Sequence, residues 1–480
     1  MQLTKSKYLI GLQCTKYLWT AVNHPELIPE PDETAKYRFD EGYRVEGLAK
    51  SLFKGISLPR DSLEKTLEAL KKRKVLFEPS FKVGSLYARA DILRPVKGQW
   101  DIIEVKQGGS VKEVYFHDVS FQRYVYEKAG LSIRKCFIMH VDTSYVMKGK
   151  LNPRKLLKLE DITKEVEIAQ SGIEDRIGCM LDIVHLKESP SVKLSKGCTS
   201  PYECPVNECW DFLPEHHVFH LYRAGQKAFE LYEKEIYAIA DIPDDVKLTE
   251  HQEIQRQCAK TGETFVHGES LKHFLKTLHY PLCYLDFESF SSAIPFYSGT
   301  RPFQAIPFQF SLHVIKDNKS KAKHYSFIHS GKSDPRLKFL KSLKKVLSKE
   351  GTIIAYNQSF EKSVLNTLCV MYPKYRKWVG LVNDRIVDLI VPFRSFYYYS
   401  PKQKGSASLK NVLPAVTGKD YKDLDISNGN DASLAYLEMV RGKASKKDKD
   451  KIKKDLEKYC GLDTEGMVWI VDELRRIVYG

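Results

Sequence analysis

The sequence predicts an α/β protein in which two mixed-sheet domains are joined by a helical connector. The chain has 480 residues, which is long enough for two or three domains. In both halves, short apolar runs broken by Pro and Gly alternate with helix-forming segments, a pattern typical of sheets covered by helices. Residues 215–278 lie between the halves and are charged and helix-forming. We therefore expect domains over 1–214 and 279–480 with this connector between them.

The first half begins with helix-forming sequence and continues with strands. The strand prediction rests on the apolar runs VLFEPSFKVG, SLYARADILRPV and GQWDIIEVKQ, which are separated by turn residues. The expected elements are helices over 1–50, strands within 75–116, a helix over 121–129, a strand over 136–142 and largely helical chain over 155–195.

The second half starts with the apolar run YPLCYLDFESF, which predicts a strand. A second apolar run then pairs with it, and strands and helices alternate afterwards. The expected elements are strands over 280–290 and 305–315, a helix over 335–349, a strand over 351–356, and helices over 360–369 and 446–479.

Composition and charge narrow the classes of partner. Hydrophobic residues make up 42% of the chain and charged residues 29%, so a packed core is expected. Lysine and arginine number 76 against 61 acidic residues, and the resulting net charge of +15 favours a polyanionic partner. The alternative is an ordinary protein from a lysine-rich proteome.

Targeting and membrane signals are not evident in the sequence. The longest apolar run near the N-terminus, Tyr8–Leu12, is too short for the core of a signal peptide. No stretch approaches the roughly 20 apolar residues that cross a bilayer. The ten cysteines are too sparse for a disulfide scaffold. We therefore expect a cytoplasmic protein with reduced or metal-bound thiols and no membrane partner.

Carboxylates and a lysine form a first chemical pattern within residues 1–150. Glu46 lies on an expected helix, Asp91 on the strand YARADIL, and Glu104 and Lys106 on one face of the strand DIIEVK. Such carboxylates suit a hard divalent ion, which lowers the pKa of a bound water. Lys106 would position that water or stabilise negative charge. An ordinary surface pair of Asp91 and Glu104 fits poorly, because both lie among apolar strand residues.

The order of these residues resembles the RecB-type branch of the PD-(D/E)XK nucleases. That branch carries G-x-x-x-E, Asp, E-x-K and Q-x-x-x-Y, and here the elements are Gly42–Glu46, Asp91, Glu104–Lys106 and Gln122–Tyr126. The resemblance implies a restriction-endonuclease-like fold that acts on DNA, with Asp91 and Glu104 holding Mg²⁺ or Mn²⁺. The catalytic residues it implies are Glu46, Asp91, Glu104, Lys106, Gln122 and Tyr126.

Three cysteines cluster after this pattern. Cys198, Cys204 and Cys209 lie in GCTSPYECPVNEC, with a spacing unlike the paired C-x2-C units of a zinc ribbon. Cys14 is the natural candidate for a fourth ligand. The layout of one cysteine before the nuclease core and three after it resembles RecB-type nucleases with an iron–sulfur centre. That resemblance implies a 4Fe–4S cluster, and a structural Zn²⁺ site is the alternative. We expect the other cysteines to be small buried residues.

Residues 279–480 carry a second set of carboxylates. Asp286 and Glu288 lie two apart on an expected strand and therefore on one face. Glu361 lies in the first turn of an expected helix, and Tyr459 and Asp463 lie four apart on one face of another. The four carboxylates would hold two divalent ions about 4 Å apart, and Tyr459 would orient the attacking water.

These motifs resemble the DEDD (DnaQ-like) 3′→5′ exonucleases of the tyrosine subclass, whose third motif is Y-x-x-x-D. The resemblance implies an RNase H-like fold. That family usually carries Asp where this chain has Glu361, and the longer side chain changes the geometry of the site. The segments IVDLIVPFR and YYYSPKQKGSASLKNVLPAV are similar to an uncharacterised bacterial and archaeal domain family that commonly follows a RecB-type nuclease domain. Asp388 is either an additional carboxylate of the site or a helix cap.

Basic and aromatic residues interleave over residues 394–410. Residues 396–399 are candidates for stacking on unpaired bases, unless this segment is a tyrosine-rich packed loop. The candidates for contacts to phosphates are Arg394, Lys402, Lys404 and Lys410.

The sequence therefore predicts a metal-dependent nuclease with two active sites and an iron–sulfur cluster. DNA is the expected substrate of the first domain, and DNA or RNA that of the second. One alternative hypothesis is a nucleic-acid-binding subunit of a repair or defence complex with one or no active site. Another is a structural zinc protein without nuclease activity.

Overall fold

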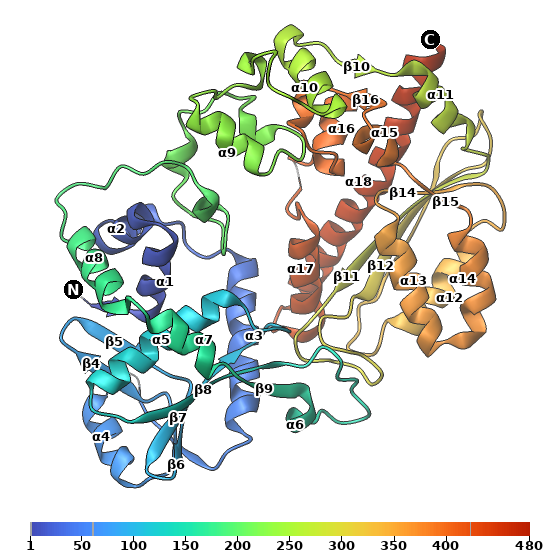
Figure 1. The fold of residues 1–480 in the computed structure, drawn as a ribbon. Helices are drawn as coiled ribbons and strands as arrows, with labels where there is room; N and C mark the ends of the chain where they lie inside the picture. The colour runs from blue at the N-terminus through green and yellow to red at the C-terminus, as the bar shows by residue number, and fades with distance from the viewer. Residues whose placement is uncertain (1, 60–61, 423) are drawn as a thin grey trace. The chain divides into compact units, whose positions relative to one another are not determined.

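The computed structural model describes residues 2–59, 62–422 and 424–480. Helices and mixed sheets alternate along the chain (Figure 1), which confirms the predicted α/β class. Within the described ranges, no helix combines the length and the apolar character required to cross a bilayer.

The chain divides into two compact units. Unit 1 contains Met1–Phe212 and Ser292–Gln304, and unit 2 contains Leu213–Ser291 and Ala305–Gly480. The expected connector, residues 215–278, therefore belongs to unit 2. One reason is that its strand β10 (Phe265–Val266) pairs with β16 (Tyr398–Tyr399) of the same unit.

A six-stranded mixed sheet in the order β2-β3-β6-β7-β8-β9 forms the centre of unit 1. The pairs β2–β3 and β7–β8 are parallel, and the remaining pairs are antiparallel. A smaller sheet has the order β1-β5-β4. The strands of unit 1 are β1 (Leu3–Thr4), β2 (Gly55–Ser57), β3 (Val75–Phe77), β4 (Ser80–Val83), β5 (Leu86–Arg89), β6 (Ile92–Val96), β7 (Gln99–Lys106), β8 (Ile133–Val141) and β9 (Leu157–Asp161).

Helices pack on both faces of β7. Because residues two apart in a strand share a face, alternate residues of β7 contact different helices. Trp100 and Ile102 belong to the core cluster that includes the apolar residues of α5, whereas Ile103 and Val105 pack with those of α3. The helix expected over 121–129 is the second half of α5. The helices of unit 1 are α1 (Lys5–Gln13), α2 (Thr15–Asn23), α3 (Glu33–Lys50), α4 (Leu63–Lys71), α5 (Glu113–Lys128), α6 (Pro153–Leu156), α7 (Thr163–Gln170) and α8 (Ile173–Val184).

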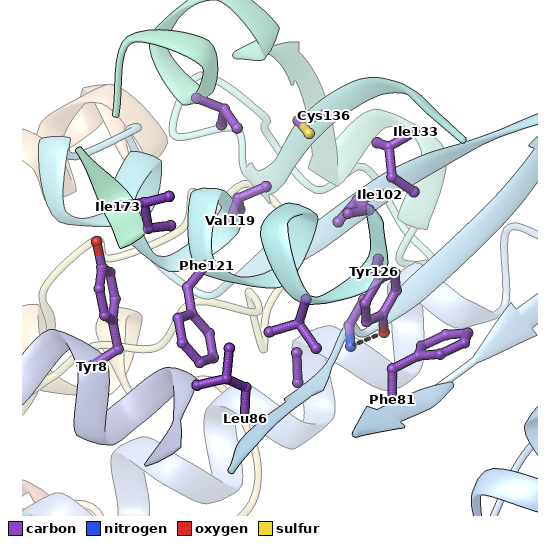
Figure 2. Close-up of a cluster of buried hydrophobic side chains, with 14 of the residues drawn as sticks. Tyr8, Phe81, Leu86, Ile102, Val119, Phe121, Tyr126, Ile133, Cys136 and Ile173 are labelled. Carbon is purple, nitrogen blue, oxygen red and sulfur yellow. Dashed lines mark hydrogen bonds between the residues drawn. The ribbon is translucent and has the colours of Figure 1, made fainter. Parts of the chain in front are cut away.

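Figure 2 shows the core cluster between α5 and the strands of unit 1. Tyr126 lies in this cluster beside Phe81, and its side chain is fully buried. Its hydroxyl donates to the carbonyl oxygen of Pro79 at 2.6 Å and accepts from the amide of Ala90 at 2.8 Å. The predicted site residue Tyr126 therefore fixes the backbone next to Asp91 from within the core.

Unit 2 is built on a five-stranded sheet in the order β13-β12-β11-β14-β15. The strands β11, β12 and β13 are antiparallel, and β14 and β15 run parallel to β11. The strand with Asp286 and Glu288 is therefore central. The strands of this sheet are β11 (Leu282–Phe290), β12 (Ile306–Ile315), β13 (Lys323–Ile328), β14 (Ile353–Ala355) and β15 (Ile386–Asp388).

The longest helix, α18, packs on the antiparallel strands of this sheet, whereas α12 packs on β12 and β13 (Figure 1). The observed bounds of α18 equal the expected 446–479, and the helix expected over 360–369 lies within α13. The helices of unit 2 are α9 (Gln226–Glu233), α10 (Glu250–Thr261), α11 (Gly268–Lys276), α12 (Arg336–Val346), α13 (Ser359–Met371), α14 (Arg376–Asn383), α15 (Val391–Arg394), α16 (Leu409–Thr417), α17 (Gly429–Arg441) and α18 (Lys446–Tyr479).

The two faces of β11 differ in chemistry because its sequence alternates. Leu285 and Phe287 belong to the apolar cluster formed with α12, α13 and α14. Asp286 and Glu288 point to the other face, where their antiparallel neighbours on β12 are Ser311 and Gln309. The sheet thus has one apolar face and one face with buried polar groups.

We expect Tyr126→Phe to destabilise unit 1 by about 1–3 kcal/mol, because the substitution leaves the carbonyl of Pro79 and the amide of Ala90 without a partner in the core. Thermal unfolding followed by circular dichroism measures this effect. Tyr124→Phe is the matched control on the same helix, since its half-exposed hydroxyl bonds to the exposed Glu174. Equal melting temperatures for the two variants would contradict the structural role of Tyr126.

Candidate metal centres

Carboxylates from three elements converge on one side of β11 in unit 2. Asp286 and Glu288 come from β11, Glu361 from the first turn of α13, and Asp463 from α18. The charges of the other three carboxylates all act on Asp286, so the four predicted residues are neighbours. The ligand atoms of Asp286, Glu288 and Cys460 lie within 4.8 Å of one another.

The acidic centre, formed by Asp286, Glu288, Glu361 and Asp463, carries more negative charge than the neighbouring cations neutralise. Burial and the neighbouring carboxylates raise the pKa of both Asp286 and Glu288 well above the usual range. Burial also raises the pKa of Asp463 to about 7 and that of Glu361 to about 8. In addition, Oε2 of Glu361 is buried and has no hydrogen-bond partner among the described residues. Buried, closely spaced carboxylates of this kind favour a bound cation.

Two tyrosines and a lysine border the acidic centre. Tyr421 donates its hydroxyl to Oδ1 of Asp463 at 2.7 Å, and the hydroxyl of the predicted residue Tyr459 also bonds to Asp463. The ammonium of Lys410 acts on Asp463 and Glu288. Lys410, which the sequence predicts as a phosphate contact, therefore lies beside the carboxylates. Tyr421 has no sequence signal, because it lies on an irregular segment far from the motifs.

Cys460 is a further neighbour that the sequence prediction treats as an ordinary buried residue. Its Sγ lies 3.4 Å from Oδ2 of Asp286 and is placed to donate to it. Burial and then the charge of Asp286 raise the pKa of this thiol well above its usual range, so the thiol is protonated. The position three residues before Asp463 on α18 is the signal that places Cys460 on the same side of the helix.

Asp388 acts as a cap in the structure. Its carboxylate accepts from the amides of Asn357 at 2.8 Å, Gln358 at 3.2 Å and Ile390 at 3.1 Å. Gln358 is the residue before α13, so these bonds hold the start of the helix that carries Glu361. Of the two alternatives that the sequence leaves open, the helix cap fits these bonds.

A second polar cluster lies in unit 1, between β7 and α5. Glu104 and Lys106 share a face of β7, and Nζ of Lys106 lies 2.9 Å from Oε1 of Glu104. Gln122 donates to Oε2 of Glu104 and to Oδ1 of Asp118, both at 2.9 Å. Lys106 also bonds to Oδ2 of Asp118 at 2.7 Å. Asp118 lies four residues before Gln122 on α5, and the sequence prediction missed it although this spacing puts both on one face.

Lys5 on α1 is the other residue that the sequence prediction missed. Its Nζ lies 2.6 Å from Oε1 of Glu104 and 4.0 Å from Oδ1 of Asp118. Burial alone would lower the pKa of Lys5, but Asp118, Glu104 and Asp91 outweigh it and raise the pKa. Nothing in the sequence signals this contact, because 99 residues separate Lys5 from Glu104.

The sequence predicts Asp91 on a strand, but in the structure Asp91 lies in a bend just before β6. One oxygen accepts from the amide of Val105 at 2.7 Å, which holds Asp91 beside β7. Burial and then the charge of Glu104 raise the pKa of Asp91 to about 7. Glu46 also acts on Asp91, but its carboxylate pairs with Lys50 at 2.6 Å.

The two clusters differ in their balance of charge. In unit 1, the ammoniums of Lys5 and Lys106 both contact Glu104, and both act on Asp118. These contacts hold the pKa of Asp118 well below its usual range, although burial alone would raise it. In unit 2, Lys410 is the cation near four carboxylates in the described chain. The centre in unit 2 is therefore the stronger candidate for a divalent cation.

The four predicted cysteine ligands are neighbours within unit 1. Burial is the main cause that raises the pKa of Cys204. The charges of Cys14, Cys198 and Cys209 also raise it. Gln13, next to Cys14, donates Nε2 to the carbonyl oxygens of Gly197 and Tyr202 at 2.7 Å each. Gly197 leaves no room for a side chain, since a Cβ there would lie 2.7 Å from the carbonyl oxygen of Gln13. These contacts bring the first cysteine to the later three.

Three of the four candidate base-stacking residues are not available for stacking. Phe396, Tyr398 and Tyr399 are 3%, 5% and 3% exposed, whereas Tyr397 is half-buried, so these three fit the packed loop that the sequence leaves open as the alternative. Phe396 stacks on His251 and on Tyr399 inside the unit, because β16 pairs with β10 and buries the segment. The nearby basic residues remain at the surface. Arg394 and Lys402 are exposed, and the exposed Lys404 pairs with Glu215 at 3.3 Å.

We expect the free energy of unfolding of the metal-free protein to fall as the pH rises from about 5 to about 8. A carboxyl group with a raised pKa binds more protons in the folded than in the unfolded state, so loss of those protons favours unfolding. The rise from 3.8 to about 7 at Asp463 corresponds to at most ~4 kcal/mol. Thermal melting in EDTA over a pH series measures this slope.

Asp463→Asn should flatten the slope, whereas Asp450→Asn, at an exposed position of the same helix, should leave it unchanged. Addition of Mn²⁺ should raise the melting temperature of the wild type most at the upper end of the pH range. A stability that increases with pH, or equal slopes for both variants, would contradict the raised pKa of the acidic centre.

The match to a protein family lies mainly in unit 2. Residues 283–408 match a family described as "Domain of unknown function (DUF2779)". This range includes Asp286, Glu288 and Glu361 and ends before Tyr459 and Asp463 of α18. The match covers too little of the chain to assign the whole protein to that family.

Two curated proteins are similar to part of the chain. The "Uncharacterized protein MG366" of Mycoplasma genitalium is 26% identical over 229 residues, which cover 43% of this chain and 34% of that protein. The "Uncharacterized protein MG366 homolog" of Mycoplasma pneumoniae is 23% identical over 222 residues, covering 42% of this chain and 33% of that protein. The chain thus spans about a third of the length of the curated relatives it matches.

Proposed function

We propose that the protein is a metal-dependent nuclease whose principal active site is the acidic centre of unit 2. The observation that carries this proposal is the meeting of four carboxylates, three of them buried and Asp286 half-buried, near a single lysine in the described chain. Burying this much like charge is costly unless a cation binds. Carboxylate oxygens are the ligands that Mg²⁺ and Mn²⁺ prefer.

The donor set fits this use. Asp286, Glu288 and Asp463 would hold the ion, and the unpartnered Oε2 of Glu361 is available as a further ligand. A bound Mg²⁺ or Mn²⁺ would acidify a water molecule and stabilise charge on a phosphoryl group. The two tyrosine hydroxyls at Asp463 fix the direction of that carboxylate, and Lys410 would attract the phosphate of the substrate.

The sheet of unit 2 supports the same assignment. An antiparallel set of three strands continues into two parallel strands beyond the central β11, as expected for the RNase H-like fold that the motifs imply. We therefore propose exonuclease chemistry of the 3′→5′ type on DNA or RNA for this unit. The net charge of +15 provides the electrostatic attraction that a polyanionic substrate requires.

For unit 1 we propose a RecB-type nuclease site that acts on DNA. Asp91 and Glu104 would hold Mg²⁺ or Mn²⁺, and Lys106 would stabilise negative charge. Gln122 holds Glu104 and Asp118 in place, and Tyr126 holds the backbone next to Asp91. Glu46 would act through its charge on Asp91.

The position of Lys5 favours a second candidate function for unit 1. Its ammonium contacts the same oxygen of Glu104 that Lys106 contacts, and it thereby supplies positive charge that a metal would otherwise bring. Under this alternative, unit 1 binds nucleic acid without cutting it, and the protein works as a nucleic-acid-binding subunit with one active site.

We also propose that Cys14, Cys198, Cys204 and Cys209 bind a 4Fe–4S cluster. The support for this proposal is that the four thiols are neighbours in unit 1, in the layout of one cysteine before the sheet and three after it that resembles RecB-type nucleases with an iron–sulfur centre. A structural Zn²⁺ held by the same four thiolates is the alternative. No disulfide joins the ten cysteines in the described chain, and on that ground we propose a location in the reducing cytoplasm.

Asp286→Asn should lower metal-dependent cleavage of end-labelled single-stranded DNA or RNA by on the order of a hundredfold or more, because it removes a charge from the metal ligands. Asp450→Asn is the matched control and should cleave like the wild type. Lys106→Met should remove cleavage by unit 1 and preserve that by unit 2. Gel electrophoresis of the labelled products with Mg²⁺ and with Mn²⁺ separates these activities.

The outcomes assign the two units separately. If Asp286→Asn abolishes all cleavage and Lys106→Met none, unit 1 is a binding unit and the alternative holds. If the double variant digests DNA and RNA as well as the wild type, neither site is a nuclease.

Anaerobic purification tests the cysteine ligands. We expect a brown protein with broad visible absorbance and about four irons and four sulfides per chain. Cys204→Ser should bleach it, whereas Cys179→Ser, at an exposed position outside the cluster, should not. A colourless protein with one zinc per chain would support the alternative metal.

A further inference from the structure

We propose that unit 2 carries a separate nucleotide pocket, built from Tyr222, Arg223, Tyr356 and Arg394, that holds one unpaired nucleotide of the strand bound at the acidic centre. The inference rests on the proposed nuclease function for its substrate class. The pocket is a cavity of about 420 Å³. This volume is within the usual range for sites that bind small ligands and nucleotides.

The pocket lies where α/β sheets commonly bind ligands. Tyr356 and Asn357 follow β14 directly, and Ile390 follows β15 by two residues. Both strands run parallel to β11, so their carboxyl ends meet at the same edge of the sheet. Ligands of open α/β sheets bind outside the carboxyl ends of the strands, next to the point where the strand order reverses. In this sheet that point is β11.

The charge of the pocket is positive and unbalanced. The guanidinium groups of Arg223 and Arg394 are exposed, and in the described residues neither forms an ion pair. The described residues that line the cavity include no acidic side chain. The carboxylate of Asp388 lies nearby, but three backbone amides occupy it. The guanidinium of Arg223 lies over the ring of Tyr222, with its Cζ 5.1 Å from the ring centroid, which leaves Tyr356 as the ring for a base. Two guanidiniums without an ion pair at one cavity favour an anion with several oxygens, such as a phosphate.

Two tyrosines give the pocket its other character. Tyr222 donates its hydroxyl to the carbonyl oxygen of Arg394 at 3.3 Å, and its ring packs edge-on against Phe396. Tyr356 donates to the carbonyl oxygen of Ala407 at 2.7 Å. These contacts fix both rings, which keep partly exposed surface. A fixed aromatic ring beside a phosphate site is suited to stacking on an unpaired base.

The pocket adjoins the acidic centre but shares no carboxylate with it. Tyr421, whose hydroxyl bonds to Asp463, also interacts electrostatically with Tyr356 of the pocket, so the two sites share this neighbour. A strand with one phosphate at Lys410 would therefore place a neighbouring nucleotide near Tyr356. Phosphate recognition by arginine and stacking by tyrosine together identify that ligand as a nucleotide unit of a single strand.

Fluorescence anisotropy of the full chain with an end-labelled oligothymidylate in EDTA tests the pocket without cleavage. Arg223→Gln and Arg394→Gln should each weaken binding about tenfold, because each removes charge-assisted bonds to a phosphate. Arg376→Gln, an exposed arginine at the start of α14, is the matched control and should bind like the wild type. Thymidine monophosphate should compete, whereas thymidine and inorganic phosphate should compete at least tenfold more weakly.

Equal affinities for the pocket variants, the control and the wild type would overturn the inference, as would equal competition by inorganic phosphate. If Arg394→Gln lowers the melting temperature, the binding affinity of Arg223→Gln decides whether the pocket exists. The side chain of Arg223 is exposed and forms no ion pair in the described chain. Loss of binding in the variants without any cleavage by the wild type would remove the proposed hydrolysis and keep the pocket. Unchanged binding in the variants together with cleavage by the wild type would remove the pocket and keep the proposed hydrolysis.

Discussion

The concentration of negative charge against β11 is the constraint on which the architecture of unit 2 depends. Four carboxylates are gathered there from a strand and two helices, and Lys410 is the cation that acts on them in the described chain. Their raised pKa values express the free energy that this arrangement costs without a cation. Such a cluster persists only where the surrounding structure holds it in place, and function is the usual reason for keeping it.

The long helix α18 is the element that holds the cluster in place. Gln309 of β12 donates to the carbonyl oxygen of Leu456 at 2.8 Å, and the hydroxyl of Thr464 bonds to Ser311 and His313 at 2.7 and 2.8 Å. These groups lie on the polar face of the sheet, and each needs a partner because the helix buries it. The same bonds fix the rotation of α18, which directs the third motif toward Asp286.

Much of this architecture follows from sequence patterns, and the rest depends on contacts that no pattern records. Period-two alternation predicts the strand and the shared face of Asp286 and Glu288, and helical spacing predicts Tyr459 and Asp463 together. The contact of Lys5 with Glu104 spans 99 residues and leaves no local trace. Composition leaves two interpretations open at residues 396–399, because the same aromatic residues suit a packed interior and a stacking surface. Pairing between β10 and β16 decides that case.

Anomalous diffraction from crystals soaked in Mn²⁺ locates the ion itself and therefore shows whether the acidic centre binds a metal. We expect an anomalous peak within about 2.5 Å of carboxylate oxygens from Asp286, Glu288 and Asp463, and its loss in Asp286→Asn. A peak elsewhere in unit 2, or none at Mn²⁺ concentrations that saturate ordinary carboxylate sites, would contradict the claim that this acidic centre is a metal site.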